Sequence, residues 1–264
     1  MSRPSRRRAT AVAAALLAAA GVAGCGGDDA TDRGARPTLT VQAAASLTDA
    51  LTACAKDYAP ARVRLSFGGS DELAAQIRQG AGGDVLAAAN TTIPQQLHEE
   101  GKVGAPVAFA GNELVLAVPA DGATVGGLDD LVRDDAATLA IGSASVPVGS
   151  YTRKVLAQLP AAQRRAIEAR VRTEEPDVKS VLAKLQQGVV DAAFVYRTDV
   201  RATKGAVRAI ALPARLGPRA AYAAAVVVGT PQAAAARAFV DDLRSGGCGR
   251  ALRAAGFLPA AAAR

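Results

Sequence analysis

Hydroxyl-bearing and small residues stand where the sequence predicts that strands end and helices begin. Ser46 follows the first predicted strand and Ser70 follows the second. Two further helix starts, at 147–149 (Pro-Val-Gly) and 176–178 (Pro-Asp-Val), offer backbone N–H groups. Helix N-termini carry unpaired N–H groups and the positive end of the helix dipole, so they suit small anions. If these four helix starts converge, the pattern favours an anion-binding site.

Each of these junctions also has a purely structural interpretation. Serine is a standard N-cap residue, and we expect both Ser46 and Ser70 to cap the helices that follow them. Asp49 lies three residues after Ser46, as in a capping box. No single junction therefore identifies a site, and only the whole set of strand-to-helix junctions along the chain favours one.

Catalytic patterns give no competing interpretation. The single histidine, His98, stands in a polar segment beside two glutamates, which is typical of a solvated surface residue. The sequence has no Gly-x-Ser-x-Gly elbow, no zinc-ligand spacing and no phosphate-binding glycine motif. We therefore predict a binding protein and not an enzyme, with no cofactor and no metal bound as a free cation.

The first 24 residues have the pattern of a secretory signal. Four arginines precede an apolar run at 9–20, which is shorter than the roughly 20 residues that a membrane span needs. Small residues then precede Cys25, as in a bacterial lipobox, so we predict that Cys25 is lipidated. An ordinary signal peptide with an incidental cysteine remains the alternative, and the export route, Sec or twin-arginine, stays open. Residues 25–37 are polar and glycine-rich, and we predict a flexible tether.

Charge and aromatic content argue against nucleic acid as a partner. The 31 basic and 24 acidic residues give a formal charge of +7, and removing residues 1–24, with four arginines and no acid, leaves +3. Aromatic residues make up only 3% of the chain and tryptophan is missing, so base-stacking platforms are not expected.

Two cysteines remain in the predicted exported domain. Cys54 falls on an apolar helical stripe, and Cys248 lies near the C-terminus. An even pair in an oxidising compartment is compatible with a disulfide that joins the two ends of the fold. A buried free thiol at Cys54 is equally compatible with the sequence.

Predicted strands and helices alternate along the domain, which indicates an α/β fold with mainly parallel sheets. The length suits two lobes better than one large sheet. The expected strands are 38–44, 63–67, 85–89, 113–119, 139–142, 192–196 and 222–228, and the expected helices are 46–58, 71–79, 94–100, 150–159, 161–171, 177–187, 232–244 and 249–255.

The order of short motifs resembles that of the molybdate-binding proteins of ABC importers, a branch of the type II periplasmic binding proteins. The matching segments run from 38 to 258 and include Ala-Ala-Ala-Ser-Leu-Thr at 43–48, Phe-Gly-Gly-Ser at 67–70, Gly-Asp-Val at 83–85, Gly-Asn-Glu-Leu-Val at 111–115, Val-Pro-Val-Gly at 146–149, Asp-Val at 177–178, Val-Tyr at 195–196 with Asp199, and Ala-Gly-Phe at 255–257.

This resemblance implies a two-lobed fold, with lobe I at 38–112 plus 226–264, lobe II at 113–225, and the ligand in the cleft between them. It implies that five groups donate hydrogen bonds to the oxyanion: the hydroxyls of Ser46, Ser70 and Tyr196 and the backbone N–H groups of Val148 and Val178. From the residues alone, Tyr196 could equally be a core tyrosine.

The implied function is capture of molybdate, and of tungstate as a near-equal in size, for an ABC permease. The implied protein is a monomer that a lipid anchors outside the cytoplasmic membrane. Another oxyanion such as sulfate is the nearest alternative. An exported enzyme or a sensor lipoprotein on the same fold are alternatives of a different class.

Overall fold

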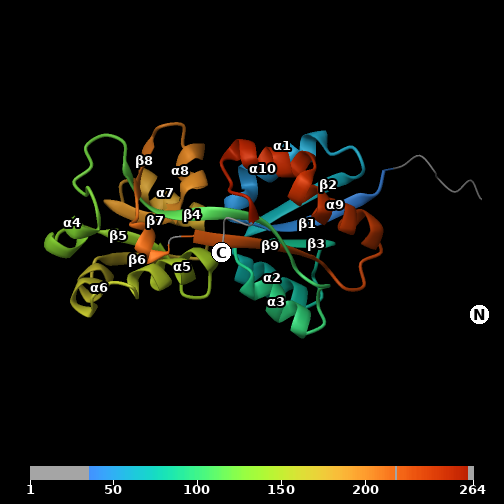
Figure 1. Ribbon diagram of the computed structural model, residues 1–264, viewed down its shortest axis with the longest axis horizontal. Helices are drawn as coiled ribbons and strands as arrows, with labels where there is room; N and C mark the ends of the chain where they lie inside the picture. The colour runs from blue at the N-terminus through green and yellow to red at the C-terminus, as the bar shows by residue number, and fades with distance from the viewer. Residues whose placement is uncertain (1–35, 218, 261–264) are drawn as a thin grey trace, which may run out of the picture. The chain divides into compact units, whose positions relative to one another are not determined.

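The computed structural model describes residues 36–217 and 219–260 (Figure 1). The predicted signal peptide, the lipidation site at Cys25 and nearly all of the predicted tether lie outside these ranges. Within the described part of the chain, no helix combines the length and apolar character that crossing a membrane requires.

Within the described ranges, nine strands form one continuous, mixed sheet. They are β1 (Thr38–Ala44), β2 (Arg62–Gly68), β3 (Val85–Ala88), β4 (Val107–Pro119), β5 (Leu139–Gly142), β6 (Val171–Glu175), β7 (Ala192–Tyr196), β8 (Val207–Ala211) and β9 (Arg219–Val226). Their order is β2-β1-β3-β9-β4-β7-β5-β6, and β8 pairs with β4.

The 13-residue strand β4 connects two halves of this sheet. Its residues up to Glu113 pair with β9, which in turn pairs with β3, whereas its residues from Leu114 onward pair with β7 and β8. We call β1, β2, β3 and β9 the first sheet half, and β5, β6, β7 and β8 the second. Parallel pairing occurs among β1, β2 and β3 and among β5, β6 and β7, as the alternating pattern predicts. The pairs that involve β4 or β9 are antiparallel, so each half is mixed.

Helices pack on both sides of each half (Figure 1). The first half is covered by α1 (Thr48–Asp57), α2 (Ser70–Arg78), α3 (Thr92–Glu99), α9 (Ala233–Ser245) and α10 (Gly247–Ala255). The second is covered by α4 (Leu128–Arg133), α5 (Pro147–Leu156), α6 (Ala161–Glu168), α7 (Val178–Gln186) and α8 (Arg197–Ala202). Short 3-10 turns occur at η1 (Ala45–Leu47) and η2 (Ala214–Leu216).

The inner strands of both halves supply much of the buried core, together with the helices that cover them. Strands β3, β5 and β7 have every residue buried, in agreement with their short apolar runs. The edge strand β6 has no buried residue and carries charged side chains, which explains why the sequence pattern predicted no strand there. Strand β8 was missed for a related reason, since only one of its five residues is buried.

A disulfide joins Cys54 of α1 to Cys248 of α10, and these two helices pack against each other. Asp242 lies beside this bond, and its carboxylate accepts the N–H groups of Gly247 and Cys248 at the start of α10. The carboxylate is therefore engaged in helix capping, and the two sulfurs are bonded to each other.

Candidate ligand-binding site

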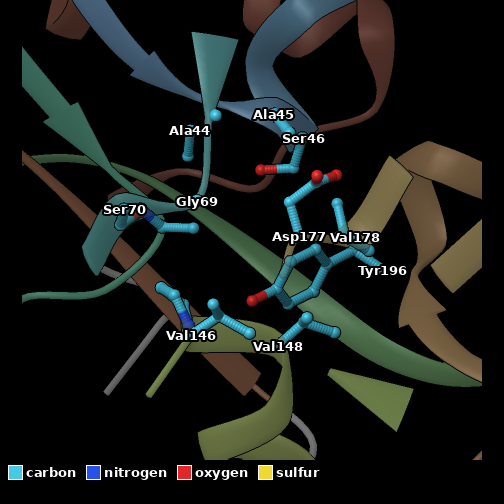
Figure 2. Close-up of a pocket in the computed structure, with 13 residues that line it drawn as sticks. Ala44, Ala45, Ser46, Gly69, Ser70, Val146, Val148, Asp177, Val178 and Tyr196 are labelled. Atoms are coloured by element: carbon cyan, nitrogen blue, oxygen red, sulfur yellow. The ribbon is translucent and has the colours of Figure 1, made fainter. Parts of the chain in front are cut away.

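A small cavity lies where the carboxyl ends of several strands meet the starts of several helices (Figure 2). Its volume is about 20 Å³, whereas about 10–15 Å³ suffices for one water molecule. The cavity is therefore little larger than one water molecule requires, which restricts it to a small ligand. Its lining residues lie at or just after the ends of β1, β2, β3 and β7, or at the starts of α2, α5 and α7: Ala44, Ala45, Ser46, Gly68, Gly69, Ser70, Ala89, Val146, Pro147, Val148, Asp177, Val178 and Tyr196.

All five residues that the family resemblance implies as oxyanion-binding groups line this one cavity. Ser46 and Ser70 come from the first sheet half, whereas Val148, Val178 and Tyr196 come from the second. Open α/β sheets bind ligands beyond the carboxyl ends of their strands, and the cavity has this location.

The predicted capping role of the two serines is wrong. Ser46 lies inside the turn η1, and α1 begins after Leu47 without a side-chain cap. Ser70 is the first residue of α2, whose N-cap is Gly69, again without a side-chain cap. Both hydroxyls are therefore available for other partners, because neither is engaged with a helix N–H group.

Each serine oxygen already accepts or shares a hydrogen bond away from the cavity. The Oγ of Ser70 accepts the N–H of Ala89 at 3.1 Å, which leaves the hydroxyl proton of Ser70 free to be donated. The Oγ of Ser46 lies 2.9 Å from the hydroxyl oxygen of Tyr222. Both serines are buried.

The hydroxyl of Tyr196 has no hydrogen-bond partner among the described residues, although it is fully buried. Figure 2 shows it directed into the space bounded by Ser70, Val146 and Val148. Burial raises the pKa of Tyr196 well above its ordinary value, so the group stays neutral and can donate. A buried unpaired hydroxyl is costly, which indicates a partner that occupies the cavity.

Backbone N–H groups at two helix starts complete the set of donors. In α7, the side chain of Asp177 accepts the N–H groups of Lys179 at 2.7 Å and Ser180 at 3.0 Å. Within the first turn of α7, only the N–H of Val178 is left without a partner in the described chain.

The start of α5 also leaves backbone N–H groups without a partner in the part of the chain that the structure describes, and a proline stands at its first position. Pro147 occupies the first helical position and has no N–H, so the N–H groups of Val148 and Gly149 are the first in the helix. Neither has a partner within the described residues.

Among the residues that the structure describes, no lysine, arginine or histidine side chain lines the cavity. Asp177 is the one carboxylate in this described lining, and it is engaged in capping α7. The ligand-facing chemistry therefore consists of neutral hydroxyl and backbone donors.

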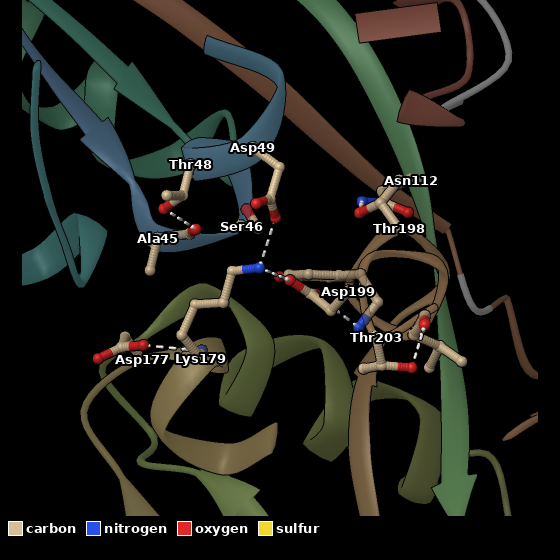
Figure 3. A network of polar contacts seen from close by, with 12 residues as sticks. Ala45, Ser46, Thr48, Asp49, Asn112, Asp177, Lys179, Thr198, Asp199 and Thr203 are labelled. Carbon is tan, nitrogen blue, oxygen red and sulfur yellow. Dashed lines mark hydrogen bonds and ion pairs between the residues drawn. The ribbon is translucent and has the colours of Figure 1, made fainter. Parts of the chain in front are cut away.

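Lys179, the residue after Val178, makes ion pairs with two helices that cover different sheet halves (Figure 3). The Nζ of Lys179 lies 2.8 Å from Oδ2 of Asp49 in α1 and 3.7 Å from Oδ1 of Asp199 in α8. Asp199 in turn accepts the backbone N–H of Tyr196 at 3.2 Å. Burial raises the pKa of Asp199 to about 7, and the nearby Lys179 offsets part of that rise. Lys179 thus connects the segments that carry Ser46, Val178 and Tyr196.

Two polar residues near the site were not identified from the sequence. Asn112 in β4 and Tyr222 in β9 are buried behind Ser46 and are hydrogen-bonded to each other at 3.4 Å. The sequence predicts Tyr222 within the apolar strand 222–228, where it is the one residue with a hydroxyl among alanines and valines. A lone polar group in such a strand is the signal that could have identified it.

Comparison with known proteins places this geometry in context. Residues 39–258 match a family described as bacterial extracellular solute-binding protein. The molybdate-binding protein ModA of Mycobacterium tuberculosis is 32% identical over 94% of this chain and 96% of its own length. A Bacillus subtilis protein, YvgL, provisionally assigned as an ABC transporter substrate-binding lipoprotein, is 34% identical over 72% of this chain and 75% of its own length.

A solved structure agrees with these sequence relatives. The substrate-binding domain of a provisionally assigned molybdenum ABC transporter from Clostridium difficile has a TM-score of 0.64 and 28% identity, and it covers 84% of this chain and 98% of its own. The predicted α/β fold of the type II periplasmic-binding-protein class is thereby confirmed.

Proposed function

The chain belongs to the bacterial extracellular solute-binding proteins, in the molybdate-binding group of ABC importers, and we propose that it captures molybdate outside the cytoplasmic membrane and delivers it to an ABC permease. The observation that carries this proposal is the composition of the cavity. Hydroxyl and backbone N–H donors from both sheet halves surround a space on the scale of a small ion, and no cationic side chain of the described residues lines it.

Neutral donors are sufficient for a fully deprotonated dianion. Hydrogen bonds to charged oxygens contribute about 1.5–3 kcal/mol each, so five such donors can outweigh the cost of removing the ion from water. A protonated oxyanion would also need an acceptor in the lining. The donor set therefore favours molybdate, tungstate and sulfate over phosphate.

Selectivity among the unprotonated dianions then depends on the size of the cavity. Molybdate and tungstate are nearly equal in size, so we expect both to bind. Sulfate has the same charge and shape but is smaller, and it is the main alternative ligand.

We further propose that the cleft closes on the ion by a hinge motion of two lobes, with lobe I at 38–112 plus 226–264 and lobe II at 113–225. The change of β4 pairing partner between Glu113 and Leu114 supports the first of these boundaries, between residues 112 and 113. Close approach across the cleft supports closure, because a Cβ added to Gly69 would lie 2.6 Å from the carbonyl oxygen of Pro176. Small-angle scattering should show compaction on adding molybdate, and identical scattering curves would contradict closure.

Anchoring to the membrane through a lipid on Cys25 is a separate proposal, supported by the basic, apolar and small-residue pattern of residues 1–25. The assignment of the related Bacillus subtilis protein as a lipoprotein agrees with it. Cys25→Ser should release the protein from the membrane fraction of the producing cell. A variant that stays membrane-bound would contradict the lipid anchor while leaving the ligand proposal intact.

Calorimetry of residues 26–264 against molybdate, tungstate, sulfate and phosphate tests the ligand proposal. We expect Ser46→Ala and Ser70→Ala each to weaken molybdate binding by about 1–3 kcal/mol. Ser145→Ala is the matched control, because Ser145 lies exposed just before α5 and outside the cavity lining. Unchanged affinity in both cavity variants would refute the assignment of the site.

A further inference from the structure

We propose that Asn112 and Tyr222 determine specificity by fixing the direction in which the Ser46 hydroxyl donates. The inference deepens the proposed oxyanion function and rests on it. Neither residue lines the cavity, yet both are buried, and the three side chains are joined in one hydrogen-bonded series. A series of hydroxyl and amide groups has a direction, because each hydroxyl carries a single hydrogen and can donate it to one partner only.

The orientation of the Asn112 amide is fixed at one end of the series. Its Oδ1 accepts the backbone N–H of Glu113 at 2.9 Å. Because that N–H can only donate, the amide cannot be reversed without placing two donors face to face. The Nδ2 group therefore faces Thr198 Oγ1 at 2.8 Å and the hydroxyl oxygen of Tyr222 at 3.4 Å, and it donates to both.

The direction of the Tyr222 hydroxyl follows from this. Its oxygen accepts from Asn112, and Oγ of Ser46 at 2.9 Å is its one other partner among the described residues. The Asn112 amide group can only donate, so Ser46 is the one acceptor that the described chain offers to the Tyr222 proton. Burial raises the pKa of Tyr222 far above its ordinary value, so the hydroxyl keeps its proton and can donate. Edge-on ring contacts with Phe109, Tyr196 and Phe257 hold the Tyr222 ring in place.

The Ser46 hydroxyl is thereby committed as a donor toward the cavity. Its oxygen accepts from Tyr222, and its own proton is left for the ligand. Ser70 is oriented in the same way, but by the backbone N–H of Ala89, which no substitution of a side chain removes. The direction of Ser46 depends on two side chains and can therefore be changed by mutation.

This arrangement discriminates by protonation state. An oxyanion without a proton accepts from Ser46, whereas a protonated oxyanion presents an O–H to a group that also donates. Without the proton from Tyr222, the Ser46 hydroxyl can rotate and offer a lone pair to the ligand. We therefore expect loss of this series to reduce the preference for unprotonated dianions.

Sulfate and phosphate form the matched ligand pair for a test. Above neutral pH both are tetrahedral dianions, but phosphate still carries one proton. Each is measured by calorimetric displacement of molybdate from residues 26–264. Tyr222→Phe removes the donor to Ser46 and keeps the ring. Asn112→Asp keeps the acceptor for Glu113 but replaces the donor with a second acceptor, which reverses the series. Tyr151→Phe is the control, because its hydroxyl interacts with the backbone of Ala221 in the same strand.

We expect Tyr222→Phe and Asn112→Asp each to weaken molybdate binding about fivefold or more and to lower the sulfate-to-phosphate affinity ratio at least fivefold. Tyr151→Phe should leave this ratio unchanged. If the parent protein binds molybdate but both variants keep the parental ratio, the inference is overturned. If one variant does not fold, as judged by circular dichroism, the other decides. If the parent protein binds none of these oxyanions, the proposed function itself fails.

Discussion

Replacing Tyr196 by phenylalanine separates a role in binding from a role in packing. The Tyr196 hydroxyl is buried and unpaired among the described residues, and it faces the cavity. In the ligand complex it would donate to a charged oxygen, and losing such a bond costs about 1.5–3 kcal/mol. We therefore expect molybdate affinity to fall about ten- to 150-fold, since 1.36 kcal/mol corresponds to a factor of ten.

The stability of the ligand-free protein should respond in the opposite way. The substitution removes a polar group that has no protein partner, so the free energy of unfolding should stay the same or rise. Tyr151→Phe provides the contrast, because the Tyr151 oxygen accepts the N–H of Ala221 at 3.1 Å outside the cavity. That variant should lose about 0.5–1.5 kcal/mol of stability and bind molybdate normally.

Calorimetry and urea unfolding of the two variants complete the test. If Tyr196→Phe binds molybdate as tightly as the parent protein, the tyrosine is a core residue and our interpretation of the unpaired hydroxyl is incorrect. A loss of stability in Tyr196→Phe equal to that in Tyr151→Phe would lead to the same conclusion.

Three further predictions concern groups around the cavity. Lys179→Met should weaken molybdate binding about two- to fivefold in calorimetry, because it removes an ion pair that connects the two sheet halves. Lys184 lies on the same helix but pairs within the second half, so Lys184→Met should leave molybdate binding unchanged. Equal effects of the two substitutions would contradict this role of Lys179. Replacing Cys54 and Cys248 together by alanine should lower the free energy of unfolding by about 2–5 kcal/mol, because the bond closes a loop of 194 residues; urea unfolding with no loss would show that the bond contributes no stability. Burial raises the pKa of Asp199 from 3.8 to about 7, so the folded protein holds a proton that the unfolded chain releases. The contribution of this proton to the free energy of unfolding is full below about pH 4 and is lost as the pH rises through 7. Asp199→Asn should remove that decline from urea unfolding measured between pH 4 and 8, and a parallel decline in both proteins would assign it to another group.

The helix starts that carry backbone donors could be predicted because their local chemistry is decisive. Pro147 fixes the first turn of α5, and Asp177 caps α7 as its place before an amphipathic stripe suggests. Both features depend on residues adjacent in the sequence.

The roles of the serine hydroxyls could not be predicted in the same way. Local preference predicts that Ser46 and Ser70 act as N-caps, but tertiary partners decide their hydrogen bonds. The partner of Ser46 is Tyr222, which is 176 residues away, and the partner of Ser70 is the backbone of Ala89. Neither pairing leaves a periodic signal in the sequence.

The charged edge strand β6 shows a second limit. Its sequence, Val-Arg-Thr-Glu-Glu, lacks the apolar alternation of a half-buried strand, and the helix predicted at 161–171 was extended into its first residue. The strand forms because β5 offers a pairing edge, not because its own residues favour a strand strongly.

The most direct test of the central claim is a crystal structure of the protein with molybdate, with the metal located by its anomalous scattering. We predict one strong molybdenum peak in the cavity, with its oxygens within hydrogen-bonding distance of the Ser46, Ser70 and Tyr196 hydroxyls and of the Val148 and Val178 N–H groups. A peak outside this cavity, or no peak with the cavity filled by water, would contradict the account.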